Sequence, residues 1–232
     1  MEINTQKPTS YERSNGLFLK VHSIFMTIQG EGPFSGHPAV FVRLAGCNLA
    51  CPFCDTEYTE NIATMSIPEI QEEIIRLHTI NNGLVVVTGG EPFRQNITRF
   101  CNMLVTRGHT VQIETNGTLP VSGALDTDVH IVCSPKTASI SETLSDHTNL
   151  YFKYVLAAGD VNSDDGLPYG VLRHPVRVCV ARPFKQTDKI YVSPMDEKDK
   201  EANKLHMKRA VKSSMDHGYI LSLQTHKIIG VK

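Results

Sequence analysis

The chain has 232 residues, of which 41% are hydrophobic, and a formal net charge of −1 at pH 7. This length suits one globular domain or a compact pair, and the balanced charge argues against a large basic surface for nucleic acid or anionic membranes. No apolar run is long enough to cross a bilayer, and the polar residues 1–15 lack the apolar core of a signal peptide. We therefore expect a cytoplasmic protein with no nucleic-acid or membrane partner.

Apolar segments typical of strands alternate along the chain with segments of helical periodicity. The predicted strands cover residues 18–26, 40–44, 84–87, 111–114, 130–133, 151–156, 189–192 and 220–223. Ser66 and Glu69 form a capping box, which marks the start of a helix. Further helices are predicted from Ile97 to Gly108 and over 197–217, and surface loops at 29–36 and 157–169.

The alternation of strands and helices predicts a parallel sheet covered by helices. About six such units are too few for a closed eight-fold barrel, so we predict an α/β fold, a partial (open) parallel β/α barrel. Residues 1–232 are expected to form a single core domain with a short N-terminal extension. Ligand sites in such folds lie at the carboxyl ends of the strands. Polar or glycine-rich segments follow the predicted strands at Gly89–Glu91, Glu114–Gly117, Ser134–Lys136 and Ser193–Asp196.

Three of the six cysteines, Cys47, Cys51 and Cys54, lie close together in the sequence. Three thiolates on one loop suit an inorganic centre, and an iron–sulfur cluster with three protein ligands leaves one iron open for chemistry. The alternative is a structural zinc completed by a distant ligand, such as one of the ten histidines. The scattered residues Cys101, Cys133 and Cys179 are predicted as core cysteines, and the stripe of Met207, Val211 and Met215 as helix packing.

The cysteine spacing Cys-x3-Cys-x2-Cys, with Phe53 before the last cysteine, is followed downstream by Thr88-Gly89-Gly90-Glu91-Pro92 after an apolar strand. The two motifs together resemble the radical S-adenosylmethionine (SAM) superfamily. The resemblance implies a site-open four-iron four-sulfur (4Fe-4S) cluster on Cys47, Cys51 and Cys54, whose open iron chelates SAM. It also implies that the strand-end glycines let the backbone approach the methionine moiety.

A narrower resemblance, to the 7-carboxy-7-deazaguanine synthase family, extends over nearly the whole chain. The matching segments are Ile28–Gly32, Phe41–Leu49, Cys54–Thr56, Glu114–Gly117, Ser134–Lys136, Ser193–Asp196 and Gln224–Lys227. The resemblance implies a ring-contracting lyase that converts 6-carboxy-5,6,7,8-tetrahydropterin to 7-carboxy-7-deazaguanine with loss of ammonia, in queuosine or 7-deazapurine biosynthesis. The hydrogen-abstracting radical would come from the cofactor, so no residue is expected to act as an acid or base to start the reaction.

The same resemblance implies a role for individual residues. Substrate would be bound by Ile28, Gln29, Gly30, Glu31, Arg43, Thr88, His226 and Lys232. SAM would be bound by Phe53, Cys54, Asp55, Gly90, Ser134, Pro135, Lys136, Ser193, Pro194, Met195 and Asp196, and Mg²⁺ by Thr56.

These roles agree with residue chemistry. Glu31 can accept hydrogen bonds from the donor-rich edge of a pterin, and Arg43 can pair with its carboxylate. The Thr56 hydroxyl is a hard oxygen ligand suited to Mg²⁺. Structural alternatives are a loop-stabilising or N-cap Glu31, a strand-end Arg43, a turn residue at Thr56, and Asp196 as the N-cap of the following helix.

Two other functions fit parts of the pattern: a radical SAM activating enzyme that acts on a partner protein, and a non-catalytic zinc or iron–sulfur binding module. Glu31, Arg43 and Thr56 argue against the first, because a protein substrate needs no pterin-binding cradle. The family resemblance further implies a homodimer and an external electron donor such as flavodoxin.

Overall fold

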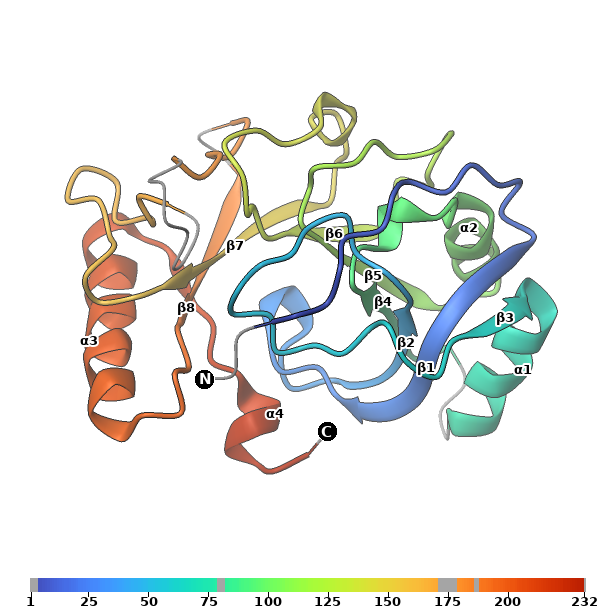
Figure 1. Cartoon of the computed structure of the whole chain (residues 1–232), viewed down its shortest axis with the longest axis horizontal. Helices are drawn as coiled ribbons and strands as arrows, with labels where there is room; N and C mark the ends of the chain where they lie inside the picture. Colours follow the sequence, from blue (N-terminus) through green and yellow to red (C-terminus); the bar gives the residue numbers. More distant parts are fainter. Residues whose placement is uncertain (1–3, 79–81, 171–178, 186–187, 232) are drawn as a thin grey trace.

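The computed structural model describes residues 4–78, 82–170, 179–185 and 188–231 of the chain (Figure 1). A nine-stranded sheet with the order β3-β1-β2-β4-β5-β6-β7-β8-β9 forms its centre. The strands are β1 (Phe18–Ile28), β2 (Pro38–Leu44), β3 (Ala63–Ser66), β4 (Leu84–Gly89), β5 (Thr110–Thr115), β6 (His130–Cys133), β7 (Leu150–Leu156), β8 (Lys189–Pro194) and β9 (Ile220–Leu221). The helices are α1 (Ile67–Leu77), α2 (Thr98–Thr106), α3 (Lys200–His217) and α4 (Thr225–Ile228), with the 3-10 turns η1 (Gly32–Phe34), η2 (Pro92–Arg94) and η3 (Glu142–Leu144).

Strand direction divides the sheet into a parallel body and an antiparallel edge. Each neighbouring pair from β2 to β9 is parallel, whereas β1 runs antiparallel to β2 and β3 antiparallel to β1. The open α/β sheet confirms the predicted fold class, but the expectation of a wholly parallel sheet is wrong at this edge. The loop between β1 and β2 is too short for the crossover that a parallel pair needs.

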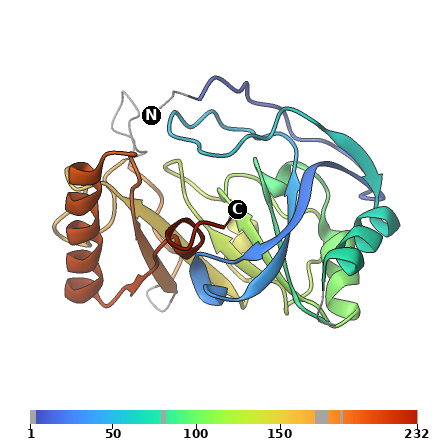
Figure 2. The same ribbon diagram turned by 90° about the horizontal axis from the view of Figure 1, so that it is seen from below.

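Helices cover the sheet unevenly. α1 and α2 lie at one end of the sheet and α3 at the other (Figure 2). The predicted capping box is present at the start of α1: the Glu69 carboxylate accepts a hydrogen bond from Ser66 N at 2.7 Å, and Ser66 Oγ accepts one from Glu69 N at 3.4 Å. The connections β5–β6 and β6–β7, both fully described, contain no α-helix, so the predicted alternation of strands and helices fails there.

The two faces of the sheet have different roles. The main core includes Val85, Val87 and Ile113 of the sheet and Ile74 and Phe100 of the helices, all buried. Residues that alternate with these along the strands point to the opposite, inner face. A small second cluster of Ala39, Leu84 and Val86, packed against Phe34 and Phe41, closes the amino-terminal end of that face. The inner face is therefore free to carry polar residues at the carboxyl ends of the strands.

The predicted surface loop at 29–36 is surface-exposed only at its tip. Gln29 and Gly30 are buried, and Ser35 and Gly36 are exposed. The loop hydrogen-bonds to the C-terminal segment, with Gly32 N donating to Ser222 Oγ at 3.2 Å and Thr225 N donating to the Gly30 carbonyl at 3.2 Å. These bonds join the β1–β2 end of the sheet to the α4 end, and this explains the loop's burial.

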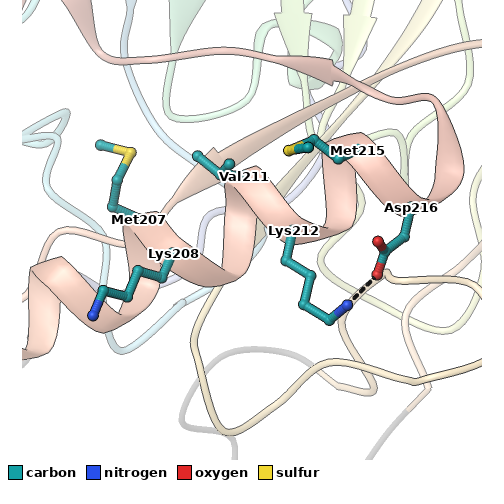
Figure 3. Close-up of a pocket in the computed structure, with 6 residues that line it drawn as sticks. All are labelled: Met207, Lys208, Val211, Lys212, Met215 and Asp216. Carbon is teal, nitrogen blue, oxygen red and sulfur yellow. Dashed lines mark hydrogen bonds and ion pairs between the residues drawn. The ribbon is translucent and has the colours of Figure 1, made fainter.

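The methionine stripe on α3 is the clearest misprediction of packing. α3 buries His206, Ala210 and Ser213 instead, while Met215 is 79% exposed. Figure 3 shows the outer face of α3, where a pocket is lined by Met207, Lys208, Val211, Lys212, Met215 and Asp216. All six residues come from one helix, so this pocket is not part of the inner face of the sheet.

The prediction that the three scattered cysteines lie in the core is right for two of them. Cys101 and Cys133 are fully buried, as predicted, whereas Cys179 is exposed, so its assignment to the core is wrong. Among the described residues, no helix is both long enough and apolar enough to span a membrane.

Candidate active site

The inner face carries a row of polar residues where the central strands end. Arg43 of β2 is the register partner of Thr88 of β4, and Thr88 Oγ1 donates a hydrogen bond to Glu114 Oε2 of β5 at 3.2 Å. Glu114 also accepts hydrogen bonds from Gln29 at 3.0 Å and from Gln112 at 3.2 Å. Two residues predicted to bind substrate, Gln29 and Thr88, are thus oriented by one carboxylate.

Arg43 has an unusual environment within this row. Its guanidinium carbon lies 5.3 Å from the centre of the Phe25 ring, and its Nε is buried without a hydrogen-bond partner among the described residues. Burial lowers the pKa of Arg43, although nearby carboxylates such as Asp55 and Glu114 oppose the shift. A buried guanidinium donor without a partner is suited to an anionic ligand.

Glu31 and Lys153 form a buried ion pair beside this row. Lys153 Nζ of β7 donates to Glu31 Oε2 at 2.6 Å, and both side chains are 12% exposed. Burial alone would raise the pKa of Glu31, but Lys153 outweighs it and lowers that pKa below its ordinary value. Glu31 makes no side-chain cap to η1, so its predicted alternative role as a capping residue is not observed.

The C-terminal segment lies against the 29–36 loop and forms one side of the site. A Cβ atom added to Gly30 would lie only 1.8 Å from His226 Nδ1, so the absence of a side chain at Gly30 allows His226 to lie against the loop. Lys227 Nζ lies 3.2 Å from Asp55 Oδ2 and 3.7 Å from Asp196 Oδ2. α4 therefore links the 29–36 loop, the end of β8 and residues 45–62, here called the cysteine loop because they carry the three cysteines. Lys232 lies outside the described residues.

The cysteine loop follows β2 and is packed tightly against the end of β4. A Cβ atom at Gly89 would lie 2.2 Å from the Leu44 carbonyl oxygen, and one at Gly90 would lie 2.3 Å from the Gly46 carbonyl oxygen. Gly89 is therefore required by the close approach of the end of β2, and Gly90 by the close approach of the loop that carries the cysteines.

Glu91 connects this loop to β5. Its backbone N–H donates to the Gly46 carbonyl at 3.0 Å, and its fully buried carboxylate accepts hydrogen bonds from Thr115 Oγ1 at 2.7 Å and Asn116 N at 2.7 Å. Burial raises the pKa of Glu91 to about 7, and the hydrogen bonds partly oppose this shift. In the radical SAM-like motif, Glu91 is thus a structural junction.

Two of the segments predicted to bind SAM meet beside the cysteines, and the third is buried at the end of β8. Lys136 Nζ lies 5.9 Å from the centre of the Phe53 ring and donates to Ser134 Oγ at 2.6 Å. Ser193 is 1% exposed, and its Oγ has no hydrogen-bond partner among the described residues. Pro135 and Met195 are buried, and Pro194 is partly buried. Cys54 N donates to the Cys51 carbonyl at 3.1 Å, and Gly90 lies against the Gly46 carbonyl.

Asp196 does not cap α3, in contrast to the structural alternative considered for it. Its Oδ1 accepts hydrogen bonds from Lys198 N and Asn203 Nδ2, and Asp199 is the N-cap of α3. Asp196 is therefore directed to the junction with Lys227 and Asp55.

The donor set of the cysteine loop fits an iron–sulfur cluster. Cys47 is buried, Cys51 and Cys54 are partly exposed, and all three are free thiols. Burial raises the pKa of Cys47 to about 12 and raises those of Cys51 and Cys54, so the metal-free thiols are protonated at neutral pH. Because iron binds thiolates, loading the loop would release these protons. The partnerless Ser193 Oγ and Arg43 Nε add polar groups that suit bound ligands. The described residues contain no group of three His, Cys, Asp or Glu side chains arranged to hold a single metal ion.

Sequence reasoning missed Lys153, Lys227 and the orienting role of Glu114. Lys153 carried one detectable signal, because a lysine interrupts the otherwise apolar strand β7, whose side chains alternate between buried and partly buried. Its partner Glu31 is 122 positions away, and no local pattern joins the two.

Comparison with known protein families indicates the general class of this protein. A family model described as the Radical SAM superfamily matches residues 42–131, which include the three-cysteine loop and Gly90. Together with the open β/α sheet and the donor set of that loop, this match indicates the radical SAM class of proteins.

Individual relatives narrow the assignment. The chain is 39% identical over 224 residues to 7-carboxy-7-deazaguanine synthase of Rhodospirillum rubrum, with 94% of each chain covered. It is 40% identical over 225 residues to the protein of the same name from Rickettsia prowazekii, with 94% of this chain and 91% of the relative covered. The crystal structure of QueE from Escherichia coli shares the fold, with a TM-score of 0.67 at 22% identity over 91% of this chain and 99% of that one.

The chain belongs to the 7-carboxy-7-deazaguanine synthase family. Membership in a radical SAM family implies a 4Fe-4S cluster and SAM as cofactors. It also favours the predicted synthase over a partner-activating enzyme and over a non-catalytic metal-binding module.

Proposed function

We propose that the protein converts 6-carboxy-5,6,7,8-tetrahydropterin to 7-carboxy-7-deazaguanine and ammonia; the name of its relatives gives the product, and the family resemblance implies the substrate and the loss of ammonia. The observation that carries the proposal is the charge arrangement on the inner face. An ionised Glu31, held by buried Lys153, and the Arg43 guanidinium with an unpartnered Nε suit a ligand with N–H donors and a carboxylate. A pterin carboxylic acid has both groups.

The cofactor set follows from the family, and we propose its ligands here. Cys47, Cys51 and Cys54 would hold the 4Fe-4S cluster, which with SAM supplies a hydrogen-abstracting radical when bound. The SAM-binding residues would be those predicted from the sequence: Phe53, Cys54, Asp55, Gly90, Ser134, Pro135, Lys136, Ser193, Pro194, Met195 and Asp196. Two sets of contacts support this proposal. Phe53 lies against Lys136, and Lys227 contacts both Asp55 and Asp196, so the cysteine loop, residues 134–136 and the end of β8 are brought together.

The chain's own residues then bind and orient the substrate. Glu31 would accept hydrogen bonds from the N–H groups of the pyrimidine edge, and Lys153 would keep it ionised for that purpose. Arg43 would pair with the substrate carboxylate. Glu114 would hold Thr88 and Gln29 in place, and His226, pressed against Gly30, would close the wall beside Ile28. Lys232 stays part of the proposed substrate set on the family resemblance alone.

Several further features belong to the same proposal. Thr56 would bind Mg²⁺ through its hydroxyl, an oxygen ligand of the type that Mg²⁺ prefers. The enzyme would act as a single-domain homodimer, with an external one-electron donor such as flavodoxin, and its product would enter queuosine or 7-deazapurine biosynthesis.

The test is a single-enzyme reaction. Anaerobically reconstituted protein is incubated with 6-carboxytetrahydropterin, SAM, Mg²⁺ and dithionite, and products are separated by liquid chromatography with mass detection. We expect 7-carboxy-7-deazaguanine and ammonia in equal amounts, and neither with the Cys51→Ala variant. A cluster-loaded protein that cleaves SAM reductively and leaves the pterin unchanged would contradict the proposed substrate.

A further inference from the structure

The N-terminal residues Asn4–Glu12, here called the N-terminal strap, cross over the cysteine loop. In Figure 1 the dark blue strap runs across the loop that joins β2 to β3. The strap contributes no buried apolar side chain: Thr5, Lys7, Pro8 and Tyr11 are all exposed. Its attachment to the protein therefore depends on hydrogen bonds, and most of these go to the cysteine loop.

Two cysteine residues of the predicted cluster site are held through their backbone carbonyls. Thr9 N donates to the Cys47 carbonyl at 2.7 Å, and Thr9 Oγ1 donates to the same oxygen at 3.2 Å. Asn4 Nδ2 donates to the Cys51 carbonyl at 3.1 Å, and Asn4 N donates to the Pro52 carbonyl at 3.1 Å. The strap thus fixes the loop at both its first and its second cysteine.

Gln6 holds the third part of the loop. Its Nε2 donates to the Thr56 carbonyl at 2.9 Å, and its Oε1 accepts a hydrogen bond from Tyr58 N at 2.9 Å. The Cys54 thiol contacts the same Thr56 carbonyl, with its Sγ at 3.6 Å. One amide side chain therefore clamps the exit of the loop on both sides of Glu57.

The far end of the strap is anchored to the protein body. Buried Arg94 donates through Nη1 to the Ser10 carbonyl at 3.1 Å and through Nη2 to the Ala45 carbonyl at 2.9 Å. Glu12 N donates to the Arg94 carbonyl at 2.8 Å. Because Ala45 precedes the cysteine loop, Arg94 ties the strap and the base of the loop to one side chain.

We propose that Asn4, Gln6 and Thr9 of the N-terminal strap are positioning residues that hold the three-cysteine loop in its cluster-binding shape and slow the loss of iron from it. Loops are otherwise the most mobile parts of a fold, and iron held by only three cysteines is lost more readily when those ligands move apart. The inference rests on the proposed role of Cys47, Cys51 and Cys54. It assigns the strap a role at the cluster and none in contacting substrate.

The test measures cluster retention in the full-length protein. Asn4→Ala, Gln6→Ala and the double variant are reconstituted anaerobically, and iron loss to a ferrous chelator is followed by the visible absorbance of the cluster. Thr5→Ala and Lys7→Ala are matched controls, since both residues are exposed on the same strap. Gln6→Glu separates the two bonds of Gln6, because it keeps the acceptor for Tyr58 N and removes the donor to Thr56.

We expect the double variant to lose its cluster about tenfold faster than the wild type, since three hydrogen bonds to the loop are removed. The controls should match the wild type, and Gln6→Glu should resemble Gln6→Ala. The thermal midpoint of the iron-free protein should stay unchanged, because the strap buries no apolar side chain. The electron paramagnetic resonance signal of the reduced cluster should broaden in the double variant as the ligand geometry becomes heterogeneous.

Equal rates of cluster loss in the double variant, the controls and the wild type would overturn the positioning role while leaving the proposed reaction intact. A lowered thermal midpoint of the iron-free double variant would also overturn it, since the strap would then stabilise the fold as a whole. A wild-type protein that binds no 4Fe-4S cluster would overturn the proposed function together with this inference.

Discussion

Lys153 Nζ lies 2.6 Å from Glu31 Oε2, with both side chains 12% exposed, and the two residues are 122 positions apart in the sequence. Removing ions from water is costly, and a buried pair is retained only when the partners satisfy each other. Burial would raise the pKa of Glu31 and lower that of Lys153, yet the mutual attraction reverses both shifts. Both groups are therefore charged throughout the neutral pH range, and Glu31 is available as an acceptor.

Lys153→Met is expected to raise the KM for the pterin about tenfold to hundredfold, the effect of a lost charged hydrogen-bond acceptor, with a smaller change in kcat. Without Lys153, burial raises the pKa of Glu31, with only His226 left to favour ionisation and Asp55 opposing it. The KM of the variant should therefore rise as the pH falls, whereas that of the wild type stays flat. Steady-state kinetics across the neutral pH range measure both effects.

Lys153→Arg is the rescue variant, because it keeps a cation at the same position. Lys189→Met on neighbouring β8 is the matched control. Lys189 is exposed, and its ammonium group lies over the Tyr151 ring. A KM for Lys153→Met that is raised equally at every pH would show that Lys153 acts on substrate by another route.

Arg43 gives a second prediction, because its buried Nε has no partner in the described structure. Arg43→Lys keeps the charge but loses the planar fork that binds a carboxylate bidentately, and we expect KM to increase at least about tenfold. The iron-free Arg43→Met protein should be as stable as the wild type or more so, since an unpartnered buried donor costs about 1–3 kcal/mol. Kinetics and urea unfolding, with exposed Arg99→Met as the control, test both parts. A large loss of stability in Arg43→Met would indicate a structural role.

Thr56 and Mg²⁺ are tested by titration. Thr56→Ala removes the proposed hydroxyl ligand, so the Mg²⁺ concentration for half-maximal activity should rise about tenfold, in line with the loss of one ligand or its support. Thr56→Ser should behave as the wild type. Thr59→Ala, three positions further along the same connection, is the control. Thr59 is exposed and donates hydrogen bonds from its backbone N–H and its hydroxyl to the Glu57 carboxylate. Superimposable Mg²⁺ curves for Thr56→Ala and the wild type would remove Thr56 from the metal site.

Gly30 and His226 are predicted to be energetically coupled. A methyl group at Gly30 would occupy the space of His226 Nδ1, 1.8 Å away, and the histidine must then swing out. Gly30→Ala, His226→Ala and the double variant should therefore lose similar amounts of kcat/KM, since neighbouring substitutions are not additive. Gly159→Ala, where an added Cβ meets nothing within 4 Å, should match the wild type. Additive losses in the double variant would show that the two residues act independently.

The sequence alone predicted features that depend on local pattern. The strand at 130–133 and the capping box at Ser66 agree with the structure because a continuous apolar run and a capping motif are local signals. β3 was missed because Ala63–Ser66 has no alternation and pairs only at the sheet edge, and α4 because it is only four residues long. The antiparallel β1 depends on pairing partners that no local pattern specifies.

For the candidate site, too, the sequence predicted what depends on strand order and missed what depends on contacts between distant segments. The strand-end rule brought together Gly90, Glu114, Ser134 and Ser193, because strands of one parallel sheet end at one edge. The partners that set their electrostatics, Lys153 for Glu31 and Lys227 for Asp55, come from distant segments. Their contacts arise from tertiary packing, and only the family resemblance could assign chemical roles before the fold was known.

Glu91 leads to a prediction about stability and pH. Its carboxylate is fully buried, and burial raises its pKa from 4.5 to about 7. Between these two values the folded protein binds more protons at this group than the unfolded chain, so the unfolding free energy falls as the pH rises. A shift of this size corresponds to about 3 kcal/mol of stability, present at low pH and lost as the pH passes through about 7.

Glu91→Gln removes this titration while keeping an acceptor oxygen for Thr115 Oγ1 and Phe93 N. Urea unfolding of the iron-free wild type and variant at a series of pH values measures the effect as a difference, so that other titrating groups cancel. The unfolding free energy of the wild type, relative to that of the variant, should be highest near pH 5. It should fall by most of about 3 kcal/mol by pH 8. A difference that stays constant over this range would mean that Glu91 is ionised in the fold at all these pH values. Its bonds from Thr115, Asn116 and Phe93 would then outweigh its burial, and the junction between β4 and β5 would be held by a charged group.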